Sequence, residues 1–358
     1  MRTKRFDINA SLATKGIAIL MLLFFHLFLN GSTYHERYDI VYYPFPEKNI
    51  CNIATVCKIC VGLFALISGY GLYLNYKKTN LSPSKWVVQR EMKLLSGFWF
   101  VVVCCWVVCQ IINGYPQTKY FSDNIYKGIT NMLIEFLGCS TLFGTPTLTG
   151  VWWYMSAGVV FIAAVPLIIS LEDKLLPLLL AVVALPRILG VGYQGSMAIY
   201  SFLFTFLLGM ICAKYDFVNK WINCRKFMRG GGKFVIELAV LLIGYKFYRK
   251  IPIDVFWEFH YGVYPLLVIL FSTEFIYSIP GIQKCLVYLG KHSANMYFVH
   301  ALFLYHYLTD FIYEMPYFLI TYVLLIGISL GTSVLVEWIK KLVHYNQAVD
   351  RIIKSIVK

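Results

Sequence analysis

Charged residues are scarce in this chain. They make up 14% of its 358 residues, whereas hydrophobic residues make up 59% and the mean hydropathy is +0.66. These values exclude an ordinary soluble domain and predict a protein that folds almost wholly within the bilayer. The apolar runs are about twenty residues long, which is typical of membrane helices and longer than the strands of a membrane barrel.

Common catalytic and metal-binding motifs are also missing. The sequence has no nucleophile elbow, no phosphate-binding Walker loop and no H-E-x-x-H helix. Cys57 and Cys60 form a C-x-x-C, but no second pair completes a zinc site, so packing in an apolar helix is the expected role. The histidines lack clustered carboxylates. We therefore expect no metal site and no tightly bound cofactor.

Ten apolar stretches are candidates for membrane helices. They are 12–30, 51–75, 93–113, 151–171, 175–191, 196–213, 233–249, 258–278, 293–311 and 316–338. A further stretch, 124–139, contains Asn131, Glu135 and two glycines, which favours an interfacial or re-entrant helix. The predicted fold is an all-α, polytopic transmembrane bundle of about ten spans. The loops hold no separate soluble domain, so residues 1–358 are expected to be one membrane domain.

The distribution of positive charge predicts the orientation. With ten spans both termini lie on one side, and most of the 32 lysine and arginine residues lie there too, although Arg249 and Lys250 fall opposite. Because basic loops are retained in the cytoplasm, both termini are expected to be cytoplasmic, in a multi-pass protein of the inner membrane. The net charge of +14 is then mostly a topology signal. Membrane lipid is the expected surrounding, and nucleic acid is not an expected partner.

Lys15 and His26 are the first candidate functional residues. They are eleven residues apart in a run that is otherwise uncharged from Gly16 to Leu29. Eleven helical steps return to within about 20° of the start, and the two side chains would lie roughly 16 Å apart along one face. Polar groups at such depth normally face a bundle interior or a wet cavity. A partly desolvated His26 could act as a general base, or it could be a helix-packing histidine.

Arg90 and Lys93 are the second candidates. Their spacing of three residues predicts a shared helix face at the cytoplasmic start of the third span. They could be anchors that extend their charges to the interface, or they could bind an anionic ligand such as a nucleotide phosphate. His300 is expected in mid-membrane, where a structural hydrogen bond is its simplest role.

Five segments in order resemble the family-three membrane acyltransferases, and the fucose-acetylase-like branch in particular. The first segment is similar to the family's opening helix, in which an aspartate precedes a basic residue that is followed, after ten further residues, by a histidine. Here these residues are Asp7, Lys15 (with Gly16 next to it) and His26. The other four segments are Phe64 with Ser68-Gly69-Tyr70, the basic pair Arg90 and Lys93, Trp153-Tyr154-Met155 with Pro166, and Leu289-Gly290 with Ser293, Tyr297 and His300. The usual proline after the basic pair and the glutamate found near the tryptophan in many members are absent.

This resemblance implies a membrane O-acyltransferase. It implies acetyl-CoA as the donor, bound from the cytoplasm, and a hydroxyl of a cell-surface glycan or lipid-linked sugar as the acceptor. His26 would be the catalytic residue, acting as a base or forming a transient acyl-histidine, while Lys15, Arg90 and Lys93 would hold the anionic parts of the acyl-CoA. Further contributions to the substrate site or its support are expected from four residues, Ser68, Trp153, Tyr297 and His300.

Two alternatives remain open from the sequence. A non-enzymatic polysaccharide exporter or flippase could use the same buried His and Lys to line a polar path. The same fold could also use a succinyl donor, whose extra carboxylate could meet Arg187 or Lys58.

Overall fold

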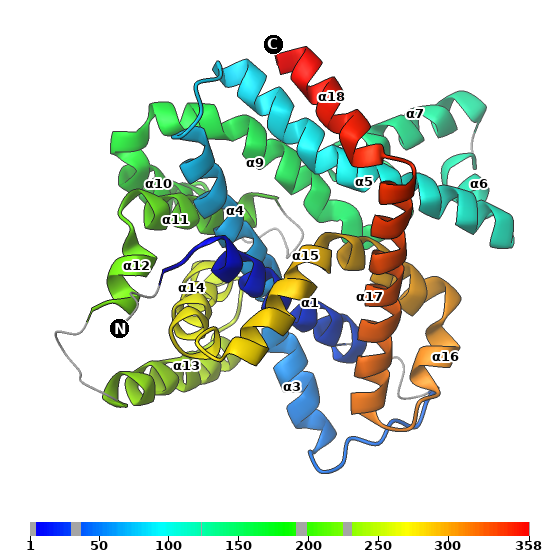
Figure 1. Cartoon of the computed structure of the whole chain (residues 1–358). Coiled ribbons are helices and arrows are strands. Elements are labelled where there is room, and N and C mark those ends of the chain that lie inside the picture. Colours follow the sequence, from blue (N-terminus) through cyan, green and yellow to red (C-terminus); the bar gives the residue numbers. More distant parts are fainter. Residues whose placement is uncertain (1–4, 30–36, 123, 191–198, 225–230, 358) are drawn as a thin grey trace. The chain divides into compact units, whose positions relative to one another are not determined.

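The computed structural model describes most of the chain as helices joined by short connections (Figure 1). The described residues are 5–29, 37–122, 124–190, 199–224 and 231–357. They divide into two compact units. Unit 1 comprises residues 1–77, 168–293 and 310–326, and unit 2 comprises residues 78–167, 294–309 and 327–358.

Unit 1 begins with a long apolar helix, α1 (Ile8–Phe28). Asp7 caps its start by accepting a hydrogen bond from the backbone N–H of Ala10 at 2.9 Å. α1 packs against α3 (Glu47–Cys57) and α4 (Cys60–Tyr76), and α4 packs along α11 (Leu203–Lys214).

The rest of unit 1 is built mainly from shorter helices. They are α10 (Leu175–Ile188), α12 (Phe217–Ile222), α13 (Gly232–Lys250), α14 (Tyr264–Phe271), and the start of α15 (Pro280–Leu302). α14 is flanked by two π-helical turns, η4 (Phe259–Val263) and η5 (Ser272–Ile276). Later in the chain, α16 (Thr309–Tyr313) and the first turns of α17 (Phe318–Leu342) also belong to unit 1.

Unit 2 is organised around α5 (Pro83–Asn113), which at about 1.5 Å per residue is roughly 46 Å long. After α5 come α6 (Tyr115–Tyr120), α7 (Ile125–Phe136), α8 (Ser140–Phe143), the short 3₁₀ turn η1 (Gly150–Trp152) and most of α9 (Trp153–Ser170). The end of α15, the π-helical turn η6 (Phe303–Tyr307), the later part of α17 and the last helix, α18 (Tyr345–Val357), complete the unit.

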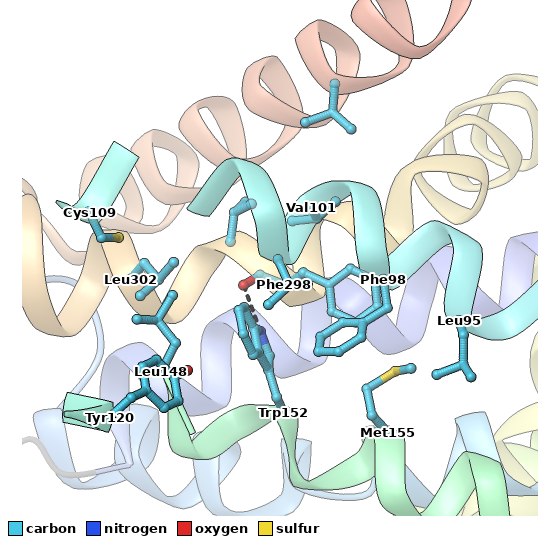
Figure 2. Packing of buried hydrophobic residues seen from close by; sticks show 13 residues of the cluster. Leu95, Phe98, Val101, Cys109, Tyr120, Leu148, Trp152, Met155, Phe298 and Leu302 are labelled. Atoms are coloured by element: carbon cyan, nitrogen blue, oxygen red, sulfur yellow. Dashed lines mark hydrogen bonds between the residues drawn. The ribbon is translucent and has the colours of Figure 1, made fainter. Parts of the chain in front are cut away.

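The core of unit 2 is aromatic and gathers around Trp152 (Figure 2). The rings of Phe98 and Trp152 meet edge to face at 5.1 Å, and Phe98 lies 5.3 Å from Phe298. The indole N–H of Trp152 donates to the backbone oxygen of Phe298 at 2.9 Å, the dashed line in Figure 2. Buried indole groups usually need such a partner, so this bond lets a large ring occupy the core.

α7 is an inside-out helix. Asn131 and Glu135 are buried, whereas Ile129 and Leu133 are about half exposed and Ile125 is more so. An apolar outer face over a polar inner face is the arrangement expected for a helix surrounded by lipid. At 12 residues α7 is too short to cross a bilayer, in agreement with the interfacial or re-entrant helix expected for 124–139.

The all-helical membrane bundle predicted from the sequence is confirmed. Within the described residues, six helical segments are long and apolar enough to cross a membrane. They are 8–28, 47–76, 83–113, 150–170, 259–276 and 318–342. The count of ten spans and the cytoplasmic side of both termini stay predictions.

Two predicted boundaries were wrong. The helix expected over 293–311 begins at Pro280 and ends at Leu302. The helix expected from 93 begins at Pro83, so Arg90 and Lys93 lie about two turns inside α5 rather than at its entrance. In both cases a polar stretch continues the helix because polar side chains do not prevent helix formation, although they reduce the apolar signal used to find it.

Candidate functional site

Lys15 and His26 lie on one uninterrupted helix, α1, so the eleven-residue spacing holds in the structure. Both side chains are half-buried within the protein. The His26 imidazole lies in the last turn of α1, with its ring centroid 5.0 Å from that of Phe25. α1 therefore presents an ammonium group and an imidazole about three turns apart on nearly the same face.

Close helix packing explains the glycine that follows Lys15. A Cβ on Gly16 would lie 2.1 Å from the backbone oxygen of Leu286, and one on Gly290 would lie 1.9 Å from that of Leu12. α1 and the start of α15 thus touch backbone to backbone at two glycines that belong to separate motifs. No other residue type fits either position without a shift of the backbone.

Ser68 lies on α4, beside a second crossing of this kind. A Cβ on Gly69 would lie 2.1 Å from the backbone oxygen of Phe206, and one on Gly209 would lie 2.1 Å from that of Leu66. Ser68 is half-buried, and its position on α4 is fixed by the contact of its neighbour Gly69 with α11. Lys15, His26 and Ser68 all belong to unit 1.

Arg90 and Lys93 belong to unit 2 and differ in their surroundings. The Arg90 guanidinium lies 5.9 Å from the centre of the Trp86 ring, and its Nε is buried without a hydrogen-bond partner. Lys93 is exposed. Next to Arg90, both carboxylate oxygens of Glu91 are buried and accept no hydrogen bond. No role was expected for this carboxylate from the sequence, although its position between two basic residues distinguishes it.

Tyr297 and His300 lie near the end of α15, in unit 2. The Tyr297 hydroxyl donates to the backbone oxygen of Val151, just before the tryptophan pair. His300 is fully buried, and its Nδ1 lies 2.8 Å from the backbone oxygen of Tyr297. A hydrogen bond of His300 to its own helix agrees with the structural role expected for it.

Trp153 begins α9 and is half-buried, with its ring edge-on to Tyr154 at 5.5 Å. The preceding Trp152 is the residue that fills the core and bonds to Phe298. Sequence analysis singled out Trp153 and missed Trp152, although two consecutive tryptophans indicated that one of them would face inward.

Glu135 is the best-satisfied buried carboxylate of unit 2. It is 1% exposed and accepts hydrogen bonds from the Thr147 hydroxyl, the Tyr120 hydroxyl, the backbone N–H of Leu148 at 2.8 Å and the indole of Trp106 at 3.1 Å. Burial raises the pKa of the Glu135 carboxyl, and the hydrogen bonds from Thr147 and Tyr120 oppose that effect. Every donor is neutral, so Glu135 is not an interfacial charge but a buried anchor for the connection that leads to Trp152.

His260 is a further buried histidine that sequence analysis did not consider. Its Nδ1 lies 2.8 Å from the backbone oxygen of Phe256 and its Nε2 lies 3.1 Å from that of Tyr248. A neutral imidazole can donate to one of these two oxygens, and the contact with Tyr248 places His260, in the π-helical turn η4, against the end of α13. This is the geometry of a structural histidine, in contrast to the more accessible His26.

Among the described residues, no group of three or more side chains of metal-binding type comes together. The chemically distinctive groups are instead the α1 pair in unit 1 and the basic pair on α5 in unit 2. A half-buried imidazole can accept a proton from a hydroxyl, and guanidinium and ammonium groups can bind phosphate.

The chain also matches a known protein family. A family model described as an acyltransferase domain matches residues 11–338, which includes helices of both units. Comparisons with curated proteins and with solved structures gave no match. The match begins within α1 and ends within α17, and so covers every candidate residue from Lys15 to His300. The chain therefore belongs to the acyltransferase 3 family and is a multi-pass membrane acyltransferase.

Proposed function

We propose that the protein is an O-acetyltransferase of the inner membrane. It would move an acetyl group from acetyl-CoA to a hydroxyl of a cell-surface or lipid-linked saccharide. The observation that carries the proposal is the placement of Lys15 and His26 on one unbroken helix, both half-buried, in a chain whose family transfers acyl groups. A basic pair elsewhere in the fold, Arg90 and Lys93 on α5, adds two cations suited to a phosphorylated donor.

The proposed reaction needs one base. A neutral His26 imidazole would take the proton of the sugar hydroxyl as its oxygen attacks the thioester carbonyl carbon. A C–O ester bond forms and the C–S bond of acetyl-CoA breaks. The proton then passes from His26 to the departing CoA sulfur, so the enzyme returns to its starting state without any other reactant.

The remaining candidates would bind and orient the substrates. Lys15, Arg90 and Lys93 would neutralise the phosphates of CoA, with Arg90 able to make two parallel bonds to one phosphate. A second group of residues is proposed to contact the substrates or support the site, namely Ser68, Trp153, Tyr297 and His300.

Of the two cations named for a succinyl donor, Arg187 and Lys58, Arg187 already has an anionic partner. Arg187 makes two bonds to the Glu258 carboxylate, at 2.5 and 2.9 Å, and its guanidinium lies 4.2 Å from the centre of the Trp257 ring. This charge is already compensated by a carboxylate that is 3% exposed. Arg187 is therefore poorly suited to bind the extra carboxylate of a succinyl group.

The test is acetyl transfer by purified protein in lipid nanodiscs with radiolabelled acetyl-CoA and a bacterial glycan acceptor. We expect His26→Ala to lose at least about 100-fold in kcat, since general bases contribute about 10²–10⁴-fold. His306→Ala removes an exposed imidazole and serves as the matched control.

Two results would contradict the proposal. One is unaltered transfer by a well-folded His26→Ala variant. The other is a wild-type protein that neither transfers nor hydrolyses acetyl-CoA but moves a glycan across vesicles, because this result would establish the exporter alternative.

A further inference from the structure

The backbone of α1 is bonded to a tyrosine close to His26. The hydroxyl of Tyr313, on α16, donates to the backbone oxygen of Leu27 at 3.0 Å, and Tyr313 is 2% exposed. α1 ends at Phe28, so the Leu27 oxygen is among the last carbonyls that a helix leaves without an N–H partner of its own. A carbonyl at a buried helix end is stabilised by a donor, and Tyr313 supplies one to Leu27.

A second tyrosine bonds to α1 two turns earlier. The hydroxyl of Tyr322, on α17, donates to the backbone oxygen of Leu20 at 2.9 Å. The Tyr322 ring also meets Phe24 edge to face, with centroids 5.2 Å apart. Seven helical steps separate Leu20 from Leu27, which brings the two carbonyls to within about 20° of one another around the axis.

These two bonds fix the rotation of α1 about its own axis. They hold one side of the helix at two heights, and His26 projects about 100° away from Leu27 because it is one residue earlier. Both tyrosines come from the segment 310–326, which belongs to unit 1 with α1. A small rotation of α1 would move the imidazole along an arc, so loss of either bond could change where His26 points even with the glycine contacts to α15 in place.

Tyr313 is itself held firmly. Its ring stacks on Tyr38 at 5.5 Å with an interplanar angle of 20°, and the Tyr38 hydroxyl donates to Asp310. Asp310 also pairs with Arg37 at 3.0 Å. Arg37 and Tyr38 are thus fastened to the same short helix, α16, whose Tyr313 bonds to α1.

We propose that Tyr313 and Tyr322 are positioning residues for His26, acting through the Leu27 and Leu20 carbonyls to hold the imidazole in its reactive direction. This inference rests on the proposed function, in which His26 is the base. Each tyrosine acts through the α1 backbone oxygen to which its hydroxyl bonds. In this way they control the geometry of the base.

Tyr313→Phe and Tyr322→Phe test the inference because each removes one hydroxyl and keeps the ring contacts. We expect kcat to fall about 10-fold in each and about 100-fold in the double variant, since misplacement by about 1 Å can cost 10²-fold. KM for acetyl-CoA should rise less than kcat falls, because Arg90 and Lys93 on α5 are untouched and only Lys15 turns together with α1. Tyr264→Phe is the matched control. It removes a hydroxyl of the same unit whose bond, at 3.3 Å, is to the Leu241 backbone oxygen on α13 and not to the backbone of α1.

A second measurement reports on His26 without using activity. Diethyl pyrocarbonate modifies imidazole nitrogens, and the rate at His26 can be followed by peptide mass spectrometry in the folded protein. We expect this rate to change at least threefold in Tyr313→Phe/Tyr322→Phe and to be unchanged in Tyr264→Phe. Thermal unfolding in the same nanodiscs checks that the variants are folded.

The outcomes separate the two proposals. If His26→Ala is inactive while the double phenylalanine variant keeps kcat within twofold, the positioning role is wrong and the proposed function stands. If His26→Ala remains active, the proposed function is wrong, and the modification rate alone decides whether the tyrosines orient His26. An unchanged rate would overturn the inference in that case as well.

Discussion

Gly290 lies directly against Leu12, so that a Cβ on Gly290 would stand 1.9 Å from the backbone oxygen of Leu12. The same contact brings Gly16 against Leu286. The two segments are far apart in the chain, and both lie within the match to the acyltransferase 3 family. Glycine is required at Gly16 and Gly290 because the two helix backbones approach too closely there to leave room for a side chain.

Gly290→Ala should therefore destabilise the protein. The added methyl forces α1 and α15 apart, and overpacking of this kind costs about 1–3 kcal/mol. Thermal unfolding in detergent or nanodiscs measures the effect. Gly71→Ala is the matched control, since a Cβ at Gly71 meets nothing within 4 Å. An equal response of the two variants would show that the contact is not tight.

Glu135→Gln should also destabilise the protein. Four neutral donors point at the Glu135 carboxylate, and an amide replaces one of its two acceptor oxygens with another donor. Each buried donor left without an acceptor costs about 1–3 kcal/mol, so the loss should be at least of this size. Glu314→Gln changes an exposed carboxyl and should have little effect. A Glu135→Gln variant as stable as wild type would mean that water satisfies the donors.

Glu172 should make the free energy of unfolding fall at acid pH. Hydrogen bonds from Lys77, at 2.9 Å, and from Tyr73 lower the pKa of the Glu172 carboxyl below its ordinary value of 4.5. The folded protein therefore keeps this carboxylate ionised to lower pH than the unfolded chain does. The stabilisation is fully present above the unfolded pKa and is lost as pH falls through the folded pKa.

The measurement is the difference in unfolding free energy between wild type and Glu172→Gln across pH. We expect up to about 1 kcal/mol near neutrality, because the pair is partly exposed, and a decline of this difference below about pH 4. A difference that stays constant down to strongly acid pH would show that the ionised carboxylate is not what stabilises this connection.

The basic pair on α5 gives a prediction about the donor. If Arg90 and Lys93 bind the phosphates of CoA, Arg90→Gln and Lys93→Gln should each raise KM for acetyl-CoA about 10-fold, since a hydrogen bond to a charged group contributes about 1.5–3 kcal/mol. Lys78→Gln removes another exposed cation and is the control. Titration of CoA by calorimetry checks the same effect without turnover. Normal CoA affinity in the double variant would assign the pair to membrane anchoring.

The class of fold followed from composition and run length, and each of the ten predicted spans contains helix. The exact ends did not follow, because α15 and α5 extend through polar stretches that lower the local hydropathy. The inside-out character of α7 was only partly visible. Asn131 and Glu135 signalled an unusual helix, but only the fold shows that Glu135 bonds to neutral donors rather than to a basic residue.

For the site, spacing alone identified Lys15 and His26, because within a single helix the number of residues between two side chains determines whether they share a face. Spacing could not identify Trp152, Glu91 or the tyrosines that bond to α1. Tyr313 lies 286 residues beyond Leu27 and Tyr322 lies 302 residues beyond Leu20, and each bonds to a backbone atom that carries no residue-specific signal.

The sequence by itself determined that this chain is a helical membrane protein with a lysine and a histidine on its first helix, because apolar length and helical period are local properties. Only the tertiary structure decided which glycines meet backbone, which tryptophan fills the core and which hydroxyls hold α1 in place. Those choices depend on contacts between residues that are distant in the chain, and such contacts exist only once the helices have packed.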